Sequence, residues 1–348
     1  MQPQTPIRIG NAEKNAIENC LDIIRGCQLP DGAFCMMKEA PGADIWIPPY
    51  FANHAALALV AAYQWKKDPA DLSRVKNWLS WCVRHQATDG YLPDFVGKPT
   101  DYKISAMVVD AWDSSAALFL LVLGRYYRAG GKVTGELVTA AKKALVCIQK
   151  VTDKADGLTW AKPDYPIKFF EDNIEVYAGL IQAAEFFLKI GNPAKAVEAK
   201  TQAARIARKL PRFWNADEER YGVALKAGDV PDDVLKAANQ ETHKLEAYPN
   251  GQAQLFGIAF VKPQPGAWKT AQSFPADDLD RQAPLGSERW VIASARMGGA
   301  EAKRWRQQAT QTALKFAPNT VYIFRPALMV LGLLEGADYM PGIVLPKK

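Results

Sequence analysis

The sequence contains acidic residues whose spacing suits acid–base chemistry. Asp110 and Asp113 stand three residues apart at the start of an apolar segment, so they share one face if that segment is helical. Repulsion between two such carboxyl groups can keep one of them protonated. A third acid, Asp172, opens a later apolar segment. One protonated and one ionised carboxyl form the pair that cleaves a glycosidic bond, and we therefore predict Asp110, Asp113 and Asp172 as catalytic residues.

These three residues also have a structural interpretation. An Asp at the start of a helix is a favoured N-cap and complements the positive end of the helix dipole. Capping and catalysis are compatible, so the sequence leaves both open.

Polar and aromatic residues stand at the start of each of six apolar segments. Carboxylates, amides and aromatic rings are the groups that bind a pyranose, which offers hydroxyls at its edge and C–H groups on its faces. An Asp in a loop after a turn, Asp94, is a reserve candidate for the same place. Glu175 and Arg289 also stand at the starts of these apolar segments, but we do not include them among the predicted binding residues. The predicted substrate-binding residues are Asp94, Tyr50, Asn53, His54, Trp112, Glu171, Asn250, Gln252, Glu288, Trp290 and Arg325.

Several of these candidates have simpler alternatives. Trp112 and Trp290 could pack in the core instead of binding a sugar. His54, which precedes two alanines, could be a core histidine whose ring nitrogens are hydrogen-bonded within the protein. Arg325 could clamp a substrate carboxylate or pair with a nearby acid.

A repeat of about 60 residues organises the chain. Each unit has an amphipathic helix, a loop rich in Gly and Asp, and a second helix that is apolar nearly all round. Amphipathic helices are predicted at 11–27, 70–86, 134–150, 193–212 and 300–316. Apolar helices are predicted at 50–65, 110–128, 171–190, 250–261, 286–298 and 321–335, and a weaker helix at 266–274 makes twelve.

Twelve helices in six hairpins can close into one ring. We predict an all-α (α/α)6 barrel that forms a single domain over residues 1–348, with the starts of the apolar inner helices at one mouth. Short β-hairpins are expected in the loops at Ala33–Met37 and Tyr221–Leu225. The region 215–285 carries the fewest signals, and we expect a long loop within it.

The turn and helix-start motifs are those of a known superfamily. They are the turns Gln28-Leu29-Pro30-Asp31-Gly32, Gln86-Ala87-Thr88-Asp89-Gly90 and Lys154-Ala155-Asp156-Gly157, and the openings Asp110-Ala111-Trp112-Asp113-Ser114 and Glu171-Asp172-Asn173. With them the chain resembles the six-hairpin glycosidase superfamily over nearly its whole length, most of all the unsaturated glucuronyl and rhamnogalacturonyl hydrolases. The turns also resemble those of terpene cyclases, but neither a DxDD nor a DDxxD motif is present.

The resemblance implies an (α/α)6 barrel that hydrolyses saccharides. It also implies one acid in an inner-helix opening such as Asp172 and a second about one hairpin earlier. Asp110 and Asp113 stand 62 and 59 residues before Asp172.

Composition excludes several classes of protein. The charge is +6, from 43 Lys and Arg against 37 Asp and Glu, with no basic run and no nucleic-acid-binding motif. The longest apolar run is nine residues, Ala55–Tyr63, against the roughly 20 that a membrane span needs. The five cysteines lack the CxxC pairs of a structural zinc site, and we expect buried thiols in a reducing compartment. We therefore expect a cytoplasmic protein, with a periplasmic one as the alternative if a signal peptide has been removed.

We therefore predict a carbohydrate-active enzyme, a glycoside hydrolase that cleaves a short oligosaccharide without a metal or cofactor. Neither nucleic acid nor a membrane is an expected partner. A polysaccharide lyase or sugar epimerase on the same barrel is the alternative, and His54, Tyr50, His243 and Arg325 could serve it. A saccharide-binding protein without activity is the third possibility.

Overall fold

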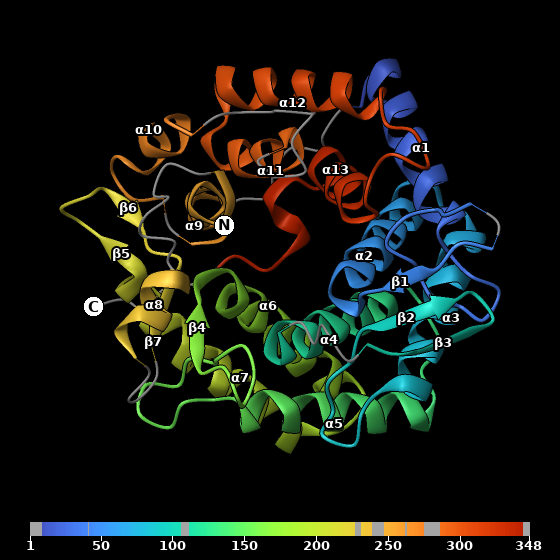
Figure 1. The fold of residues 1–348 in the computed structure, drawn as a ribbon, viewed down its shortest axis with the longest axis horizontal. Coiled ribbons are helices and arrows are strands. Elements are labelled where there is room, and N and C mark those ends of the chain that lie inside the picture. The colour runs from blue at the N-terminus through green and yellow to red at the C-terminus, as the bar shows by residue number, and fades with distance from the viewer. Residues whose placement is uncertain are drawn as a thin grey trace.

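The computed structural model describes residues 9–40, 42–105, 111–226, 231–238, 247–261, 263–274 and 286–343. In these residues the chain forms two concentric layers of helices (Figure 1). The inner helices in the described part are α2 (Pro49–Lys66), α4 (Trp112–Arg128), α6 (Phe170–Lys189), α9 (Gln252–Phe260), α11 (Ser287–Met297) and α13 (Phe324–Leu334).

The inner helices form a closed ring. Each packs against the next in sequence order, and α13 packs back against α2. Their residues are buried on nearly every side, as in α2, where Ala52 to Ala62 are all buried. A helix that is apolar all round can be stable only when neighbours cover it on every side, and the ring with its outer layer provides that cover.

The outer helices each cover a seam or flank of this ring. For example, α3 packs on both α2 and α4, and α5 packs on both α4 and α6. Side-chain caps begin three of them, from Asp68, Thr134 and Asn192. The outer helices are α1 (Asn11–Gly26), α3 (Pro69–His85), α5 (Gly135–Lys150), α7 (Pro193–Lys209), α10 (Ala267–Gln272) and α12 (Gly299–Ala313). The twelve predicted helices and the all-α fold class are thus confirmed.

The Gln-x-x-Asp-Gly motif ties neighbouring repeats together. Gly32 and Gly90 have φ of +101° and +91°, a backbone conformation that side chains with a Cβ rarely adopt. The amide of Gln86 donates to the carbonyl of Gly90 at 2.9 Å and to that of Ala140 in the next outer helix at 3.1 Å. Gln28 makes the corresponding pair of bonds one repeat earlier. The motif therefore joins each turn to the next outer helix.

Short strands lie in the loops, although not always where they were predicted. An antiparallel sheet of β1 (Ile45–Ile47), β2 (Phe95–Lys98) and β3 (Asp101–Ile104) was not predicted. The expected hairpin at Ala33–Met37 was wrong, because this stretch has only an isolated bridge between Gln28 and Phe34. The expected Tyr221–Leu225 hairpin is divided between two sheets, since β6 (Arg220–Tyr221) pairs with β5 (Trp214–Asn215) and β7 (Ala224–Lys226) pairs with β4 (Ile167–Phe169).

Two short helices lie in the region where we expected a long loop. The helix α8 (Asp232–Ala238) and the π-helix η3 (Ala247–Gly251) lie within 215–285, where a long loop was expected. The 3-10 helix η1 (Leu210–Phe213) follows α7.

The segment after α13 closes one end of the barrel. It contains the 3-10 helix η4 (Gly336–Tyr339). Arg125 of α4 donates to the carbonyl of Tyr339 at 2.9 Å, and Arg296 of α11 donates to that of Ala337 at 3.3 Å. The amide of Ile343 donates to the carbonyl of Phe260, the last residue of α9, at 2.7 Å. These anchors hold the segment across the C-terminal ends of three inner helices, and Figure 1 shows it, in red, in the middle of the ring.

Two further predictions concern the whole chain. All five cysteines are buried and free. No helix in the described ranges is long and apolar enough to cross a bilayer.

Candidate functional site

Polar side chains from inner helices that are not neighbours meet inside the barrel. Tyr50 of α2 donates from its hydroxyl to Glu175 Oε1 of α6 at 3.0 Å, and this hydroxyl also lies 3.4 Å from Glu171 Oε1. Arg289 of α11 reaches the same Glu171 Oε1 at 3.4 Å. Because α4 separates α2 from α6, and α9 separates α6 from α11, these contacts cross the interior of the ring. These side chains come from the first two turns of α2, α6 and α11.

The local sequence explains how these side chains are placed. Pro48 and Pro49 begin α2 and bring Tyr50 into its first turn. Glu171 and Glu175 are four residues apart, so they share one face of α6. The helix α9 begins at Gln252, whose amide donates to Glu171 Oε2.

The two carboxyl groups of α6 differ in how far their surroundings raise their pKa. Glu175 has no exposed surface, and burial, followed by the charge of Glu171, raises its pKa well above the ordinary value. Burial also raises the pKa of Glu171, but Arg289, Gln252 and Tyr50 oppose that increase by stabilising the ionised form. The more protonated member of the pair is therefore Glu175, and the more readily ionised member is Glu171.

His54 lies against the same cluster as a neutral imidazole. Its Nδ1 is 3.2 Å from the carbonyl of Tyr50, and a carbonyl only accepts, so Nδ1 carries the proton. Its Nε2 then faces Glu175 Oε1, at 3.7 Å, with a lone pair. Burial lowers the pKa of His54 to about 4, so the ring is uncharged at neutral pH.

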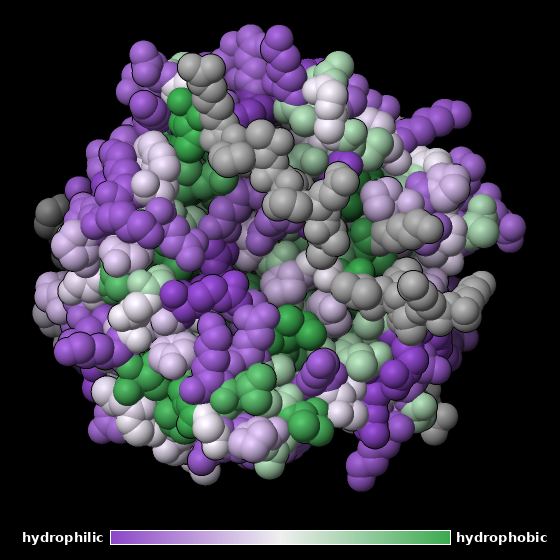
Figure 2. Space-filling view, turned by 180° about the vertical axis from the view of Figure 1, so that it is seen from behind, coloured by the Kyte–Doolittle hydropathy of each residue, from purple (hydrophilic) through white to green (hydrophobic). Residues whose placement is uncertain are grey.

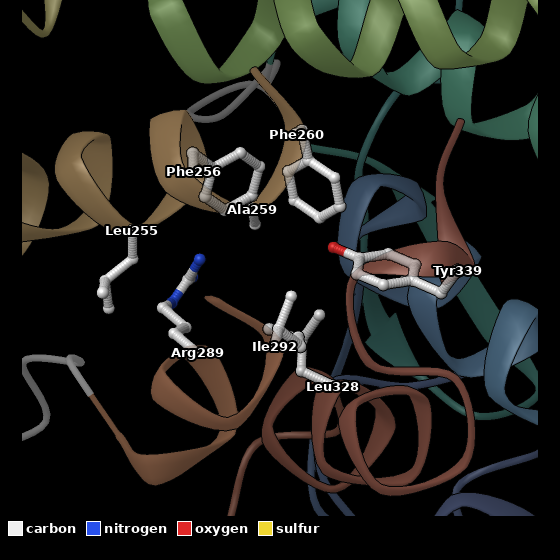
Figure 3. Close-up of a pocket in the computed structure, with 8 residues that line it drawn as sticks. All are labelled: Leu255, Phe256, Ala259, Phe260, Arg289, Ile292, Leu328 and Tyr339. Atoms are coloured by element: carbon white, nitrogen blue, oxygen red, sulfur yellow. The ribbon is translucent and has the colours of Figure 1, made fainter. Parts of the chain in front are cut away.

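A small hollow adjoins the cluster. Two polar side chains line it, Arg289 and Tyr339, and the rest of its wall is apolar. Figure 3 shows the Tyr339 hydroxyl pointing into this hollow from the C-terminal segment, with the Arg289 guanidinium below Phe256. Seen from behind, the molecule has a recess near its centre with hydrophilic residues beside it (Figure 2).

Four buried polar atoms of this cluster lack a hydrogen-bond partner among the described residues. They are Glu175 Oε2, Gln252 Oε1, Arg289 Nε and the Tyr339 hydroxyl. Buried polar atoms in proteins nearly always have partners. A concentration of unpartnered atoms in one place is therefore typical of a site that binds a polar ligand.

The predicted catalytic acids take no part in the hydrogen bonds described above for this cluster, although the charge of Asp113 also raises the pKa of Glu175. Asp113 is fully buried and accepts from the amide of Ser114 at 2.8 Å and from the hydroxyl of Thr159 at 2.7 Å. Asp172 is half-buried beside Glu171 and is near enough to act on the pKa of Tyr50. Asp110 lies outside the described residues. Glu171, Asp172 and Glu175 thus lie on one helix, α6, whereas the hydrogen bonds of Asp113 fix the start of α4.

Of the predicted binding residues, the structure joins Tyr50, His54, Glu171 and Gln252 in one cluster. Asn53 instead accepts from the indole of Trp78 at 3.0 Å, and Asp94 accepts from that of Trp46 at 3.0 Å. Glu288 is fully buried and accepts from Arg325 Nε at 2.9 Å.

The remaining predicted residues pack inside the helical layers. Trp112 stacks on Tyr91 with ring centres 4.0 Å apart, and Trp290 stacks on Trp305 at 4.4 Å. Asn250 is buried just before α9 and accepts on its carbonyl from Gln254 at 3.0 Å.

Sequence reasoning did not select three residues of the cluster: Glu175, Arg289 and Tyr339. The i, i+4 spacing of Glu171 and Glu175 was visible, and Arg289 stands beside a selected residue. Tyr339 had no signal, because a tertiary anchor of the C-terminal segment brings it to the site. In the ranges that the structure describes, no group of three His, Cys, Asp or Glu side chains could hold a metal ion.

Comparison with known proteins defines the class of fold. No model of a protein family and no curated protein sequence matches this chain. Solved structures do match. A bacterial glucoamylase complexed with acarbose has a TM-score of 0.62 at 10% identity over 96% of this chain and 57% of that one. D-mannose isomerase has a TM-score of 0.61 at 10% identity, over 95% and 100%.

The GH76A alpha-1,6-mannanase from Salegentibacter sp. HEL1_6 has a TM-score of 0.57 at 12% identity, over 94% of this chain and 100% of that one. At such identities the likeness concerns the fold alone. The chain has the (α/α)6 barrel of the six-hairpin glycosidases, and the predicted resemblance is confirmed at that level.

Proposed function

We propose that the protein is a carbohydrate-active enzyme that hydrolyses a glycosidic bond, with Glu171 and Glu175 as its two carboxyl groups. The observation that carries this proposal is that both carboxyl groups lie within hydrogen-bond distance of the one Tyr50 hydroxyl, in environments that raise the pKa of Glu175 more than that of Glu171. Glycoside hydrolysis needs two such groups close together. We prefer these two residues to the predicted set of Asp110, Asp113 and Asp172, because the hydrogen bonds of Asp113 tie it to Ser114 and Thr159 and Asp110 lies outside the described residues.

Each carboxyl then has a role that follows from its surroundings. Glu175, whose pKa is raised the more, is the general acid and donates its proton to the glycosidic oxygen as the C–O bond breaks. Its Oε2, which has no partner among the described residues, is the atom placed to do so. Glu171, stabilised by Arg289 and Gln252, is the ionised partner that activates water or attacks the anomeric carbon.

The proteins that share the fold support a saccharide substrate. By their printed names, one is a glucoamylase bound to acarbose, one a mannanase and one a mannose isomerase. Fold alone is weak evidence for a reaction, so the argument for hydrolysis rests on the carboxyl pair.

Sugar isomerisation or epimerisation is a second candidate, which His54 favours. A neutral imidazole with a free lone pair beside a buried carboxyl can remove a proton next to a carbonyl carbon. In that case Glu175 returns the proton, and Arg289 and Tyr50 stabilise the charge that develops on oxygen.

A substrate screen separates these reactions. Wild type, Glu171→Gln, Glu175→Gln and Asp172→Asn are incubated with α-linked gluco- and manno-oligosaccharides, unsaturated uronides and free aldoses, and the products are identified by chromatography. We expect hydrolysis that both Glu variants lose and Asp172→Asn keeps. Conversion of free aldoses without bond cleavage would establish isomerisation or epimerisation. Hydrolysis that survives in both Glu variants would exclude the proposed pair.

A further inference from the structure

Two cysteines face each other where the first outer helix ends. Cys27 follows the last residue of α1, and Cys35 lies beyond the turn that comes next in the chain. Gln28 and Phe34 form an antiparallel bridge across this turn, so the register brings Cys27 opposite Cys35. The backbone agrees with this register, because the amide of Cys35 donates to the carbonyl of Cys27 at 3.0 Å.

The separation of these two residues suits a disulfide. Residues directly opposite each other in an antiparallel pair have Cα atoms about 4.5–5.5 Å apart, and a disulfide spans roughly 4.4–6.8 Å between Cα atoms. The side chain of Cys35 leans toward its partner, since its Sγ lies 3.1 Å from the Cys27 carbonyl oxygen. The two thiols also hydrogen-bond to each other, which is the first cause of the raised pKa of Cys27 and of the lowered pKa of Cys35.

The third hairpin builds the same backbone without cysteine. There Thr152 and Thr159 form an isolated antiparallel bridge directly after α5, and the amide of Trp160 donates to the carbonyl of Val151 at 2.9 Å. Val151 and Trp160 thus hold the places that the two cysteines hold in the first hairpin. The fold itself therefore does not require thiols at these positions.

The other three cysteines have different surroundings. Each lies inside an outer helix, and burial raises the pKa of its thiol; they are Cys20 in α1, Cys82 in α3 and Cys147 in α5. Cys35 instead lies in a loop, keeps 4% of its surface exposed, and is followed closely by the exposed Lys38 and Glu39. Of the five thiols, that of Cys35 is therefore the one that a small oxidant should reach first.

We propose that Cys27 and Cys35 form a reversible disulfide when the folded protein meets hydrogen peroxide. The Cys35 thiolate attacks one peroxide oxygen, the O–O bond breaks, and the leaving hydroxide takes the proton of the Cys35 thiol and becomes water. The Cys27 sulfur then attacks the sulfenic acid on Cys35, and the S–O bond breaks. The hydroxyl leaves with the Cys27 proton as a second water. The two sulfurs lose two electrons, and the peroxide gains them.

The disulfide would join the end of α1 to the strand and helix that follow around the ring. Met36, next to Cys35, donates from its amide to the carbonyl of Trp46 in β1 at 2.7 Å, and its carbonyl accepts from the amide of Ile323, just before α13, at 2.7 Å. Oxidation therefore ties these contacts covalently to α1. The inference is independent of the reaction that the barrel catalyses.

Peptide mapping of the oxidised protein tests the proposal. The reduced, folded protein is treated with hydrogen peroxide and unfolded, and its remaining thiols are alkylated. Trypsin leaves both cysteines in one peptide, Gly26–Lys38, because no Lys or Arg lies between them. A second protease that cuts beside Asp31 separates the two halves unless a disulfide joins them. We expect joined halves that lack two hydrogen atoms, and we expect dithiothreitol to separate them.

Three variants locate the reaction. Cys27→Ser should leave a sulfenic acid on Cys35, which dimedone labels, and Cys35→Ser should leave Cys27 unmodified. The control, Cys82→Ala, removes a buried thiol of α3 and should form the Cys27–Cys35 disulfide as fully as wild type.

Two results overturn the proposal. One is that Cys27 and Cys35 stay reduced in the folded protein under a treatment that oxidises them in the unfolded chain. The other is that either of them pairs instead with one of the three remaining cysteines. If a serine variant fails to fold, the map of the wild-type protein still decides between these outcomes and the expected one.

Discussion

Two buried carboxyl groups on neighbouring inner helices, Asp113 on α4 and Glu175 on α6, differ in how fully they are hydrogen-bonded. Neither has exposed surface. Both oxygens of Asp113 accept hydrogen bonds, from Ser114 and Thr159. Glu175 accepts from Tyr50 on one oxygen, and its other oxygen has no partner among the described residues. Burial alone therefore does not separate these two acids, whereas incomplete hydrogen bonding inside a polar cluster does, and it is the reason that we propose Glu175 as the functional one.

The length of the side chain and its place in the helix explain this difference. Asp113 is short and lies in the first turn of α4, so it bonds to the backbone at its own helix start and to a loop hydroxyl. Glu175 is longer and lies one turn into α6, where it reaches Tyr50 across the ring. The first arrangement ties the start of α4 to a loop, and the second leaves one carboxyl oxygen without a partner among the described residues.

The largest expected effect is on activity, in Glu175→Gln. Loss of a general acid slows the reaction by roughly 10² to 10⁴-fold, and kcat on the substrate found in the screen measures it. Stability should not fall, because a protonated Glu and a Gln have similar shape and charge. A melting temperature well below that of wild type, with kcat unchanged, would show that Glu175 is structural.

The buried pair Arg325–Glu288 provides a second comparison, with Arg289–Glu171. Arg325→Met leaves the fully buried Glu288 without its cation, and breaking such a pair costs about 3–5 kcal/mol. Arg289→Met should cost less, because Glu171 is partly exposed and also accepts from Gln252. Urea unfolding gives both free energies. A larger loss in Arg289→Met would mean that the site pair, too, holds the fold together.

The comparison of Asp113 with Glu175 also shows how much of this structure could be predicted from the sequence. The ring was predictable because its signal is local: apolar helices such as α2 and α4 recur at a period of about 60 residues, and the Gln-x-x-Asp-Gly turns mark it. The site was predictable only in part. Tyr50, His54, Glu171 and Gln252 stand at helix starts, but the choice between Asp113 and Glu175 depends on Thr159, 46 residues from Asp113 along the chain. Tyr339 depends on the anchor to Arg125, 214 residues away.

The third effect is on the pH dependence of stability, through His54. Its pKa is about 4 in the folded chain against 6.5 for an ordinary histidine. The unfolded chain therefore binds more protons between these values, so the stability falls as the pH drops from about 6.5 to 4, by up to roughly 3 kcal/mol. His54→Asn, which can keep the bond to the Tyr50 carbonyl, should flatten this part of the curve. Thermal melts of both proteins at half-unit pH steps measure the difference, and parallel curves would contradict it.

The smallest expected effect is that of Asp113→Asn, and its pattern should be the reverse of Glu175→Gln. The new amide keeps one acceptor for Ser114 and turns its NH2 toward Thr159. That hydroxyl can rotate to donate to Asn173 Oδ1, 3.3 Å away. The loss of stability should therefore be only about 1 kcal/mol, measurable by urea unfolding. Activity per folded molecule should fall far less than in Glu175→Gln, because the hydrogen bonds of Asp113 go to Ser114 and Thr159 and its charge is only a minor cause of the raised pKa of Glu175. If instead kcat falls a hundredfold while stability is maintained, Asp113 belongs to the catalytic machinery after all, and the criterion of incomplete hydrogen bonding fails for this barrel.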